Sequence, residues 1–135
     1  MATTITYSND EQYEVVSVST IAAATTLTAA NSGNTYVLSA AAGAAINLPA
    51  LKSGLKFKFV VGSAFATTNW TIVCPSAIGQ GGAIVNSVNV PAANETTIAL
   101  VATAETIGDW LEILCDGTNY YINGVGTAVG AITFV

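Results

Sequence analysis

Apolar and polar residues alternate over short stretches of this chain, and residues that favour turns separate the stretches. In the segment KFKF at 56–59, the phenylalanines fall on one face of a strand and the lysines on the other. A period of two is typical of half-buried β-strands, whereas no window shows the 3.6-residue period of an amphipathic helix. We expect strands at 13–19, 25–28, 35–39, 45–48, 56–61, 70–73, 83–88, 96–102, 110–115, 120–122 and 131–134.

Glycine, asparagine and aspartate mark the turns between these strands. Asp116-Gly117, between the strands at 110–115 and 120–122, is the strongest hairpin signal. The segment GQGG at 79–82 is interpreted as a simple loop, because a phosphate-binding loop needs a following lysine and a helix start. Short strands at regular spacing with turn signals predict an all-β fold: a single-domain antiparallel β-sandwich, jelly-roll-like or related, with little or no helix.

The length of 135 residues fits a single domain over 1–135. Within it, we expect residues 1–14 to form an N-terminal arm that contacts neighbouring subunits. The acidic segment DEQYE at 10–14 is either a solvated face or an electrostatic contact to a basic partner. The strand IALV at 98–101 is apolar on both faces, which implies burial on both sides within the fold or against a partner. The predicted interface residues are Ile5, Tyr7, Tyr13, Glu14, Phe134 and Val135.

Composition limits the chemistry that the chain can perform. Only 8% of the residues are charged, against about 25% in an ordinary soluble domain. The charged residues are three lysines and eight carboxylates, with no arginine and no histidine. Such a chain lacks histidine acid–base chemistry, the usual zinc ligands and the bidentate phosphate clamp of arginine. We therefore expect no enzymatic activity, no catalytic or metal-binding residues and no cofactor.

The densest acidic stretch contains Glu105, Asp109, Glu112 and Asp116. A glycosidase needs two carboxylates that face a cleft. Glu112 falls on the strand face opposite its apolar neighbours, and Asp109 and Asp116 fall in turns, so we expect structural roles for this stretch.

Aromatic residues offer a second candidate site. Trp70, Trp110, Tyr120 and Tyr121 could form a platform for a sugar, although aromatic residues on strands belong more often to a core or a protein interface. The cysteines, Cys74 and Cys115, fall on the apolar faces of their strands. We expect both to be reduced thiols in the core.

The charge distribution also restricts the partners. The net charge is −5, and the lysines Lys52, Lys56 and Lys58 are interpreted as a solvated strand edge. Because nucleic acids and anionic membranes attract basic surfaces, we expect neither as a partner. The N-terminal segment lacks both the positive charge and the apolar run of a secretory signal, so synthesis in the cytoplasm is expected.

Six segments carry a resemblance to a known class of proteins. They are LTAANSGNTYVL at 27–38, INLP at 46–49, GLKFKF at 54–59, WTI at 70–72, GDWLE at 108–112 and DGTNYY at 116–121. This series is similar to that of small virion surface proteins of tailed bacteriophages. Head decoration (cement) proteins and tail-fibre modules share it, and its motifs are structural.

The resemblance implies a β-sandwich that assembles as homotrimers or at capsomer junctions and binds the major capsid protein. A short acidic chain without a fibrous shaft suits the outer capsid surface better than a fibre or the DNA-facing interior. We therefore expect a non-enzymatic protein on the outer capsid surface of a virion, made in the host cytoplasm, that stabilises the shell across capsid subunits. The alternative is a receptor- or glycan-binding module of a tail fibre or capsid spike.

Overall fold

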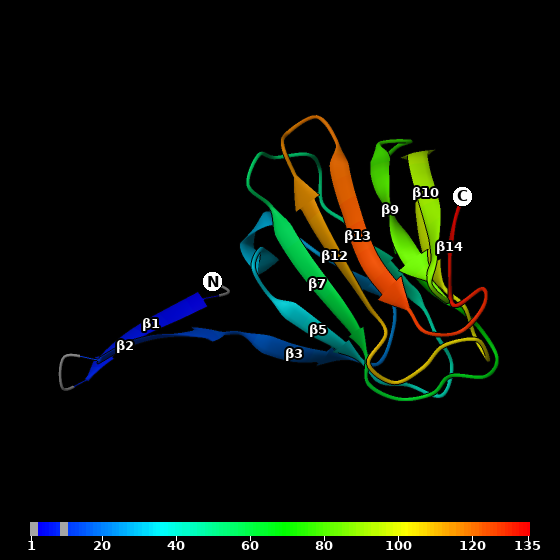
Figure 1. Cartoon of the computed structure of the whole chain (residues 1–135). Helices are drawn as coiled ribbons and strands as arrows, with labels where there is room; N and C mark the ends of the chain where they lie inside the picture. The colour runs from blue at the N-terminus through cyan, green and yellow to red at the C-terminus, as the bar shows by residue number, and fades with distance from the viewer. Residues whose placement is uncertain (1–2, 9–10) are drawn as a thin grey trace.

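The computed structural model describes residues 3–8 and 11–135, and over these residues the chain is built almost entirely from β-strands (Figure 1). A seven-stranded sheet and a five-stranded sheet pack against each other, which confirms the predicted all-β sandwich. The large sheet has the order β10 (Val88–Glu95), β9 (Gly79–Val85), β13 (Tyr120–Gly126), β12 (Trp110–Cys115), β7 (Lys56–Val61), β5 (Thr35–Leu38) and β3 (Val18–Ile21). The small sheet has the order β14 (Ile132–Phe134), β11 (Thr97–Leu100), β8 (Trp70–Val73), β6 (Ala45–Asn47) and β4 (Thr25–Thr26).

A third sheet lies outside the sandwich. Strands β1 (Thr3–Ser8) and β2 (Glu11–Val16) pair with each other as an antiparallel hairpin. Figure 1 shows this N-terminal hairpin extending away from the body of the molecule, to which β3 connects it. The strand expected at 13–19 is therefore two strands, because the pairing changes at Ser17 from the hairpin to the large sheet.

Both sheets are mixed, so the expectation of antiparallel pairing alone was wrong. From β3 to β8 the chain crosses from one sheet to the other at every connection. Successive strands within each sheet consequently run parallel: β3, β5 and β7 in the large sheet, and β4, β6 and β8 in the small one. The second half of the chain pairs mostly antiparallel, with one parallel pair between β13 and β9.

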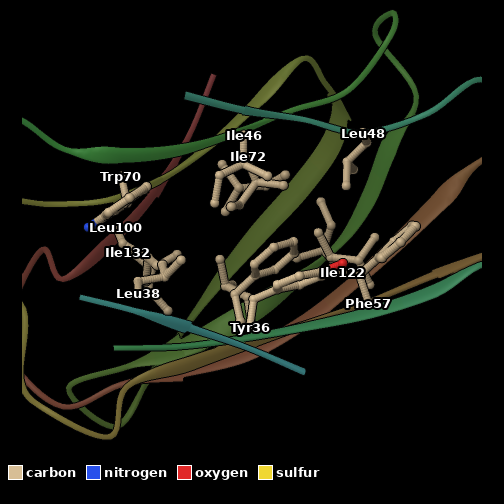
Figure 2. Packing of buried hydrophobic residues seen from close by; sticks show 14 of the residues in the cluster. Tyr36, Leu38, Ile46, Leu48, Phe57, Trp70, Ile72, Leu100, Ile122 and Ile132 are labelled. Atoms are coloured by element: carbon tan, nitrogen blue, oxygen red, sulfur yellow. The ribbon is translucent and has the colours of Figure 1, made fainter. Parts of the chain in front are cut away.

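The inner faces of the two sheets form the hydrophobic core (Figure 2). Alternation places every second residue of a strand in this core, as in β7, where Phe57 and Phe59 are fully buried. The stacked rings of Phe59 and Tyr36, with centroids 5.7 Å apart, join neighbouring strands β7 and β5. Trp70, Ile72 and Leu100 complete the core from the small sheet.

The predicted strands at 56–61, 70–73 and 110–115 agree with β7, β8 and β12 in both bounds. The region 79–88 differs. GQGG at 79–82 is the start of strand β9 and not a loop, and the strand expected at 83–88 ends at Val85. Asn86 and Ser87 then form a two-residue hairpin turn, with φ of 48° and 66°. Positive φ at both central residues is the signature of a type I′ turn.

We expected Lys56 and Lys58 on a strand edge, but their strand, β7, lies inside the large sheet between β12 and β5. They lie on the outer face of the large sheet, opposite the buried phenylalanines.

Helical structure in the described residues is limited to a 3₁₀ turn at Ala29–Asn31. No helix in this part of the chain is long and apolar enough to cross a membrane.

Candidate functional site: outer sheet face and N-terminal hairpin

Four apolar side chains form a row across the outer face of the large sheet. Strand register places Val60 opposite Trp110, Trp110 opposite Val125, and Val125 opposite Ile84. Val60 and Trp110 are half-buried, whereas 38% of Val125 and 44% of Ile84 are exposed. We call these four residues the apolar row. The outward face of a sheet normally carries polar residues, so the aligned apolar side chains of this row are a candidate interaction surface.

A hollow of about 330 Å³ adjoins the N-terminal hairpin. Its lining combines the outer faces of β5, β7 and β12 with the end of β2, and we call it the lysine hollow. Its lining residues are Val16, Gly33, Asn34, Thr35, Lys56, Lys58 and Glu112.

Neither lysine of the lysine hollow forms an ion pair in the described part of the chain, and the Lys58 ammonium contacts an aromatic ring. The Lys58 ammonium lies 5.1 Å from the centroid of the Trp110 ring, a cation–π distance. Glu112 is the cross-strand neighbour of Lys58, yet neither Lys56 nor Lys58 forms an ion pair with a residue in the described part of the chain. Both ammonium groups are thus available to an incoming carboxylate.

The predicted interface residues lie on two separate surfaces. Ile5 and Tyr7 belong to β1, and Tyr13 and Glu14 to β2, where Glu14 pairs with Ile5 in register. Phe134 and Val135 lie at the C-terminal end, on the opposite side of the molecule in Figure 1. The two sets do not form one site.

The C-terminal set is fixed to the small sheet. The carbonyl of Val135 accepts hydrogen bonds from the backbone of Thr96 and Thr97, and the Val135 amide donates to Thr97 O at 2.9 Å. The Val135 side chain is 74% exposed.

A second, apolar hollow of about 320 Å³ opens nearby between the edge strands β10 and β14, with Val88 and Ile132 among its lining residues.

Two carboxylates of the acidic stretch, those of Asp109 and Glu105, accept hydrogen bonds from loop residues, whereas Glu112 is half-buried and lines the lysine hollow. Asp109 is only 2% exposed, and its carboxylate accepts hydrogen bonds from Thr106 N, Thr127 N and Thr127 Oγ1 at 2.7–2.9 Å. The Glu105 carboxylate accepts one from Phe65 N at 2.9 Å. These two groups fix the loops that connect strands at one end of the sandwich.

Asp116 organises the predicted hairpin turn between β12 and β13. Its carboxylate accepts hydrogen bonds from the backbone of Thr118 and Asn119 and from the Tyr121 hydroxyl. The N–H groups of Asn119 and Thr118, followed by the Tyr121 hydroxyl, lower the pKa of Asp116 below its usual value. These hydrogen bonds make the Asp116 carboxylate a structural part of the turn.

The aromatic residues do not form a common platform. Trp70 and Tyr120 are fully buried, and the Tyr120 hydroxyl donates to Pro49 O at 2.8 Å. Burial raises the pKa of Tyr120 well above its ordinary range. Trp110 and Tyr121 point to the outer face, in different rows of the sheet.

Both cysteines are free and buried, as predicted, and burial raises the pKa of the Cys74 thiol to about 11. The described residues contain no group of three histidine, cysteine, aspartate or glutamate side chains placed to hold a metal ion.

Sequence reasoning missed the apolar row and the lysine hollow. Val60 and Trp110 occupy the polar phase of their strands, and this break in the alternation was the available signal. The register that aligns them with Val125 and Ile84 depends on pairing between strands far apart in the chain. No protein-family model, curated protein or solved structure matches the chain.

Proposed function

We propose that this chain is a non-enzymatic virion structural protein that decorates the outer surface of a bacteriophage capsid. It binds the major capsid protein across neighbouring subunits, assembles as homotrimers, and stabilises the shell. A protein that binds the assembled shell but not its separated subunits stabilises that shell by mass action.

The observation that carries this proposal is the apolar row. Val60, Trp110, Val125 and Ile84 present apolar groups that are aligned across four neighbouring strands of the outer sheet face. The cores of protein interfaces are depleted of charged residues and enriched in aromatic ones, so this surface suits a protein partner. The four side chains of the row are themselves uncharged, so their own burial requires no desolvation of a charge.

The charge of the whole chain supports an outer location. A net charge of −5 repels nucleic acid, which disfavours the DNA-facing interior of a shell. The chain has three positively charged side chains, and two of them, Lys56 and Lys58, line a single hollow, so the chain has no extended basic surface for nucleic acid. We therefore place the partner surface on the outside of the shell.

The test compares virions that carry the wild-type chain with virions that carry Val125→Asp/Ile84→Asp. The exposed loop substitutions Thr67→Asp/Ala66→Asp, which add the same charge away from the row, serve as the matched control. We expect the row variant to be lost from particles, which then rupture at a lower temperature, while the control is retained. Equal incorporation and equal rupture temperatures for all three would contradict the proposal.

The alternative function, a receptor- or glycan-binding module of a tail fibre or capsid spike, requires Trp70 or Tyr120 and Tyr121 to be exposed. Trp70 and Tyr120 are fully buried. Tyr121, which is 43% exposed, is therefore the one of these three aromatic residues that a ligand could reach. Copy number discriminates the two functions: hundreds of copies per virion support decoration, and a few copies together with saturable binding on a glycan array support the alternative.

A further inference from the structure

Charges of opposite sign are concentrated in two separate segments of the chain. All three lysines fall within residues 52–58, in and just before β7. Three of the eight carboxylates fall within the segment DEQYE at 10–14, which contains no cation. Glu11 and Glu14 of this segment belong to β2 in the N-terminal hairpin.

Within one copy, the lysines have no ion-pair partner among the residues that the structure describes. The N-terminal hairpin forms a sheet of its own and extends away from the body (Figure 1). The ammonium groups of Lys56 and Lys58 remain without an ion pair in the described part of the chain. A second copy can bring its acidic hairpin to the lysines that the first copy leaves unpaired.

Apolar surface beside the lysine hollow favours the same contact. Val15, Val16 and Val18, where the hairpin joins the body, are 50%, 43% and 62% exposed, and Val16 also lines the hollow. Three neighbouring exposed valines gain free energy when another chain covers them. A separate two-stranded hairpin is also marginally stable in water, so a covering partner would stabilise it.

We infer that the N-terminal hairpin of one copy docks in the lysine hollow of a second copy, with the face of β2 that carries Glu14 toward Lys56 and Lys58. This inference rests on the self-association included in the proposed function, but it does not require a capsid. Three titratable groups line the hollow: the two lysines favour the incoming carboxylates, and Glu112 opposes them. The contact is consequently selective for an acidic strand, and salt weakens it.

The test is a charge swap in the purified full-length chain, with molar mass measured by light scattering over a range of concentrations. Glu11→Lys/Glu14→Lys and Lys56→Glu/Lys58→Glu each place like charges opposite each other. We expect each variant to weaken self-association by at least about tenfold. The combined four-residue variant keeps the net charge of −5 and should regain most of the wild-type association.

Circular dichroism and thermal unfolding establish that each variant is folded. If Lys58→Glu disturbs the sheet through its contact with Trp110, the pair Glu14→Lys and Lys56→Glu repeats the test on an exposed lysine. Thr67→Lys, on an exposed loop away from both segments, is the control for added positive charge and should associate like the wild type.

Two results would overturn the inference. One is a wild-type chain that stays monomeric at every concentration; the other is an oligomer that both charge reversals leave unchanged. The second result leaves the proposed decoration function intact, since binding to capsids is measured separately on particles.

Discussion

The sandwich body and the N-terminal hairpin are both built from β-strands, but they differ in what stabilises them. Strands of the body bury one face in a common core that contains Phe57, Phe59 and Trp70. Strands β1 and β2 form a two-stranded sheet that belongs to neither sheet of the body. The body therefore contains its own source of stability, whereas the hairpin gains stability when another molecule covers it.

This difference gives the scarcity of charge a physical meaning. A charge-poor surface on the body lowers the desolvation cost of a contact, and the apolar row provides the area to bury. Lys58 adjoins the apolar row through its contact with Trp110, so the lysine hollow and the row lie side by side on one face of the body. In the proposed contact between copies, the charges of the hollow and of the hairpin provide specificity.

The largest expected effect is on the core of the body. Phe59→Ala removes a fully buried ring that stacks on Tyr36, and the cavity left behind adds to the lost transfer free energy. We expect the free energy of unfolding to fall by about 3 to 5 kcal/mol, measured by urea denaturation. A loss of less than about 1 kcal/mol would show that the body does not depend on this core.

A smaller effect is expected for the loops at one end of the body. Asp109→Ala removes the acceptor of three hydrogen bonds and leaves the backbone donors of Thr106 and Thr127 unpaired. The expected cost is about 2 to 3 kcal/mol in the same urea experiment. Asp109→Asn, which retains one acceptor oxygen, should recover part of this loss; equal losses in the two variants would rule out the hydrogen bonds as its cause.

Asp116→Ala should have a smaller, pH-dependent effect on the hairpin turn of the body. The pKa of Asp116 is lowered in the folded state, so its carboxylate contributes stability above the pKa of the unfolded chain and loses that contribution as the pH falls through the folded pKa. The wild type should be more stable than the variant at pH 7, and the two should converge in acid. A stability difference that persists unchanged to pH 2 would exclude the ionised carboxylate as its source.

Removal of residues 1–16 should have the smallest effect on the body. We expect the free energy of unfolding to change by less than about 1 kcal/mol, because β1 and β2 form a sheet of their own outside the two sheets of the body. The measurement uses dilute protein, since self-association adds concentration-dependent stability. A loss as large as that of Phe59→Ala would show that the hairpin is an integral part of the body.

Much of the body could be predicted from local pattern. Where alternation is strict, as in Lys56-Phe57-Lys58-Phe59, both the strand and its buried face were predicted correctly. The turn at Asp116-Gly117 was also predicted, because its residue types have a strong local preference. The all-β sandwich follows from many such local signals.

Features set by strand pairing could not be predicted. Gly81 lies within β9, and a Cβ there would collide with Ile122 O on the adjacent strand, so this glycine permits a close approach and does not mark a loop. Asn86-Ser87 forms a type I′ turn without the usual glycine. The parallel strands arise because short connections cross between sheets, and short connections normally suggest hairpins.

The interaction surfaces were predicted less well, for the same reason. The acidic segment and the lysine cluster were visible in the sequence, but the strand order places the lysines at the center of a sheet face and not on an edge. The apolar row needs the register of four strands, which no local pattern contains.

The molar mass of the purified chain, measured by light scattering with and without residues 1–16, tests the central claim most directly. We expect a mass that is a multiple of 13.7 kDa for the full chain and a folded monomer after the hairpin is removed. A full chain that stays at 13.7 kDa at all concentrations, or an oligomer that survives removal of the hairpin, would contradict it.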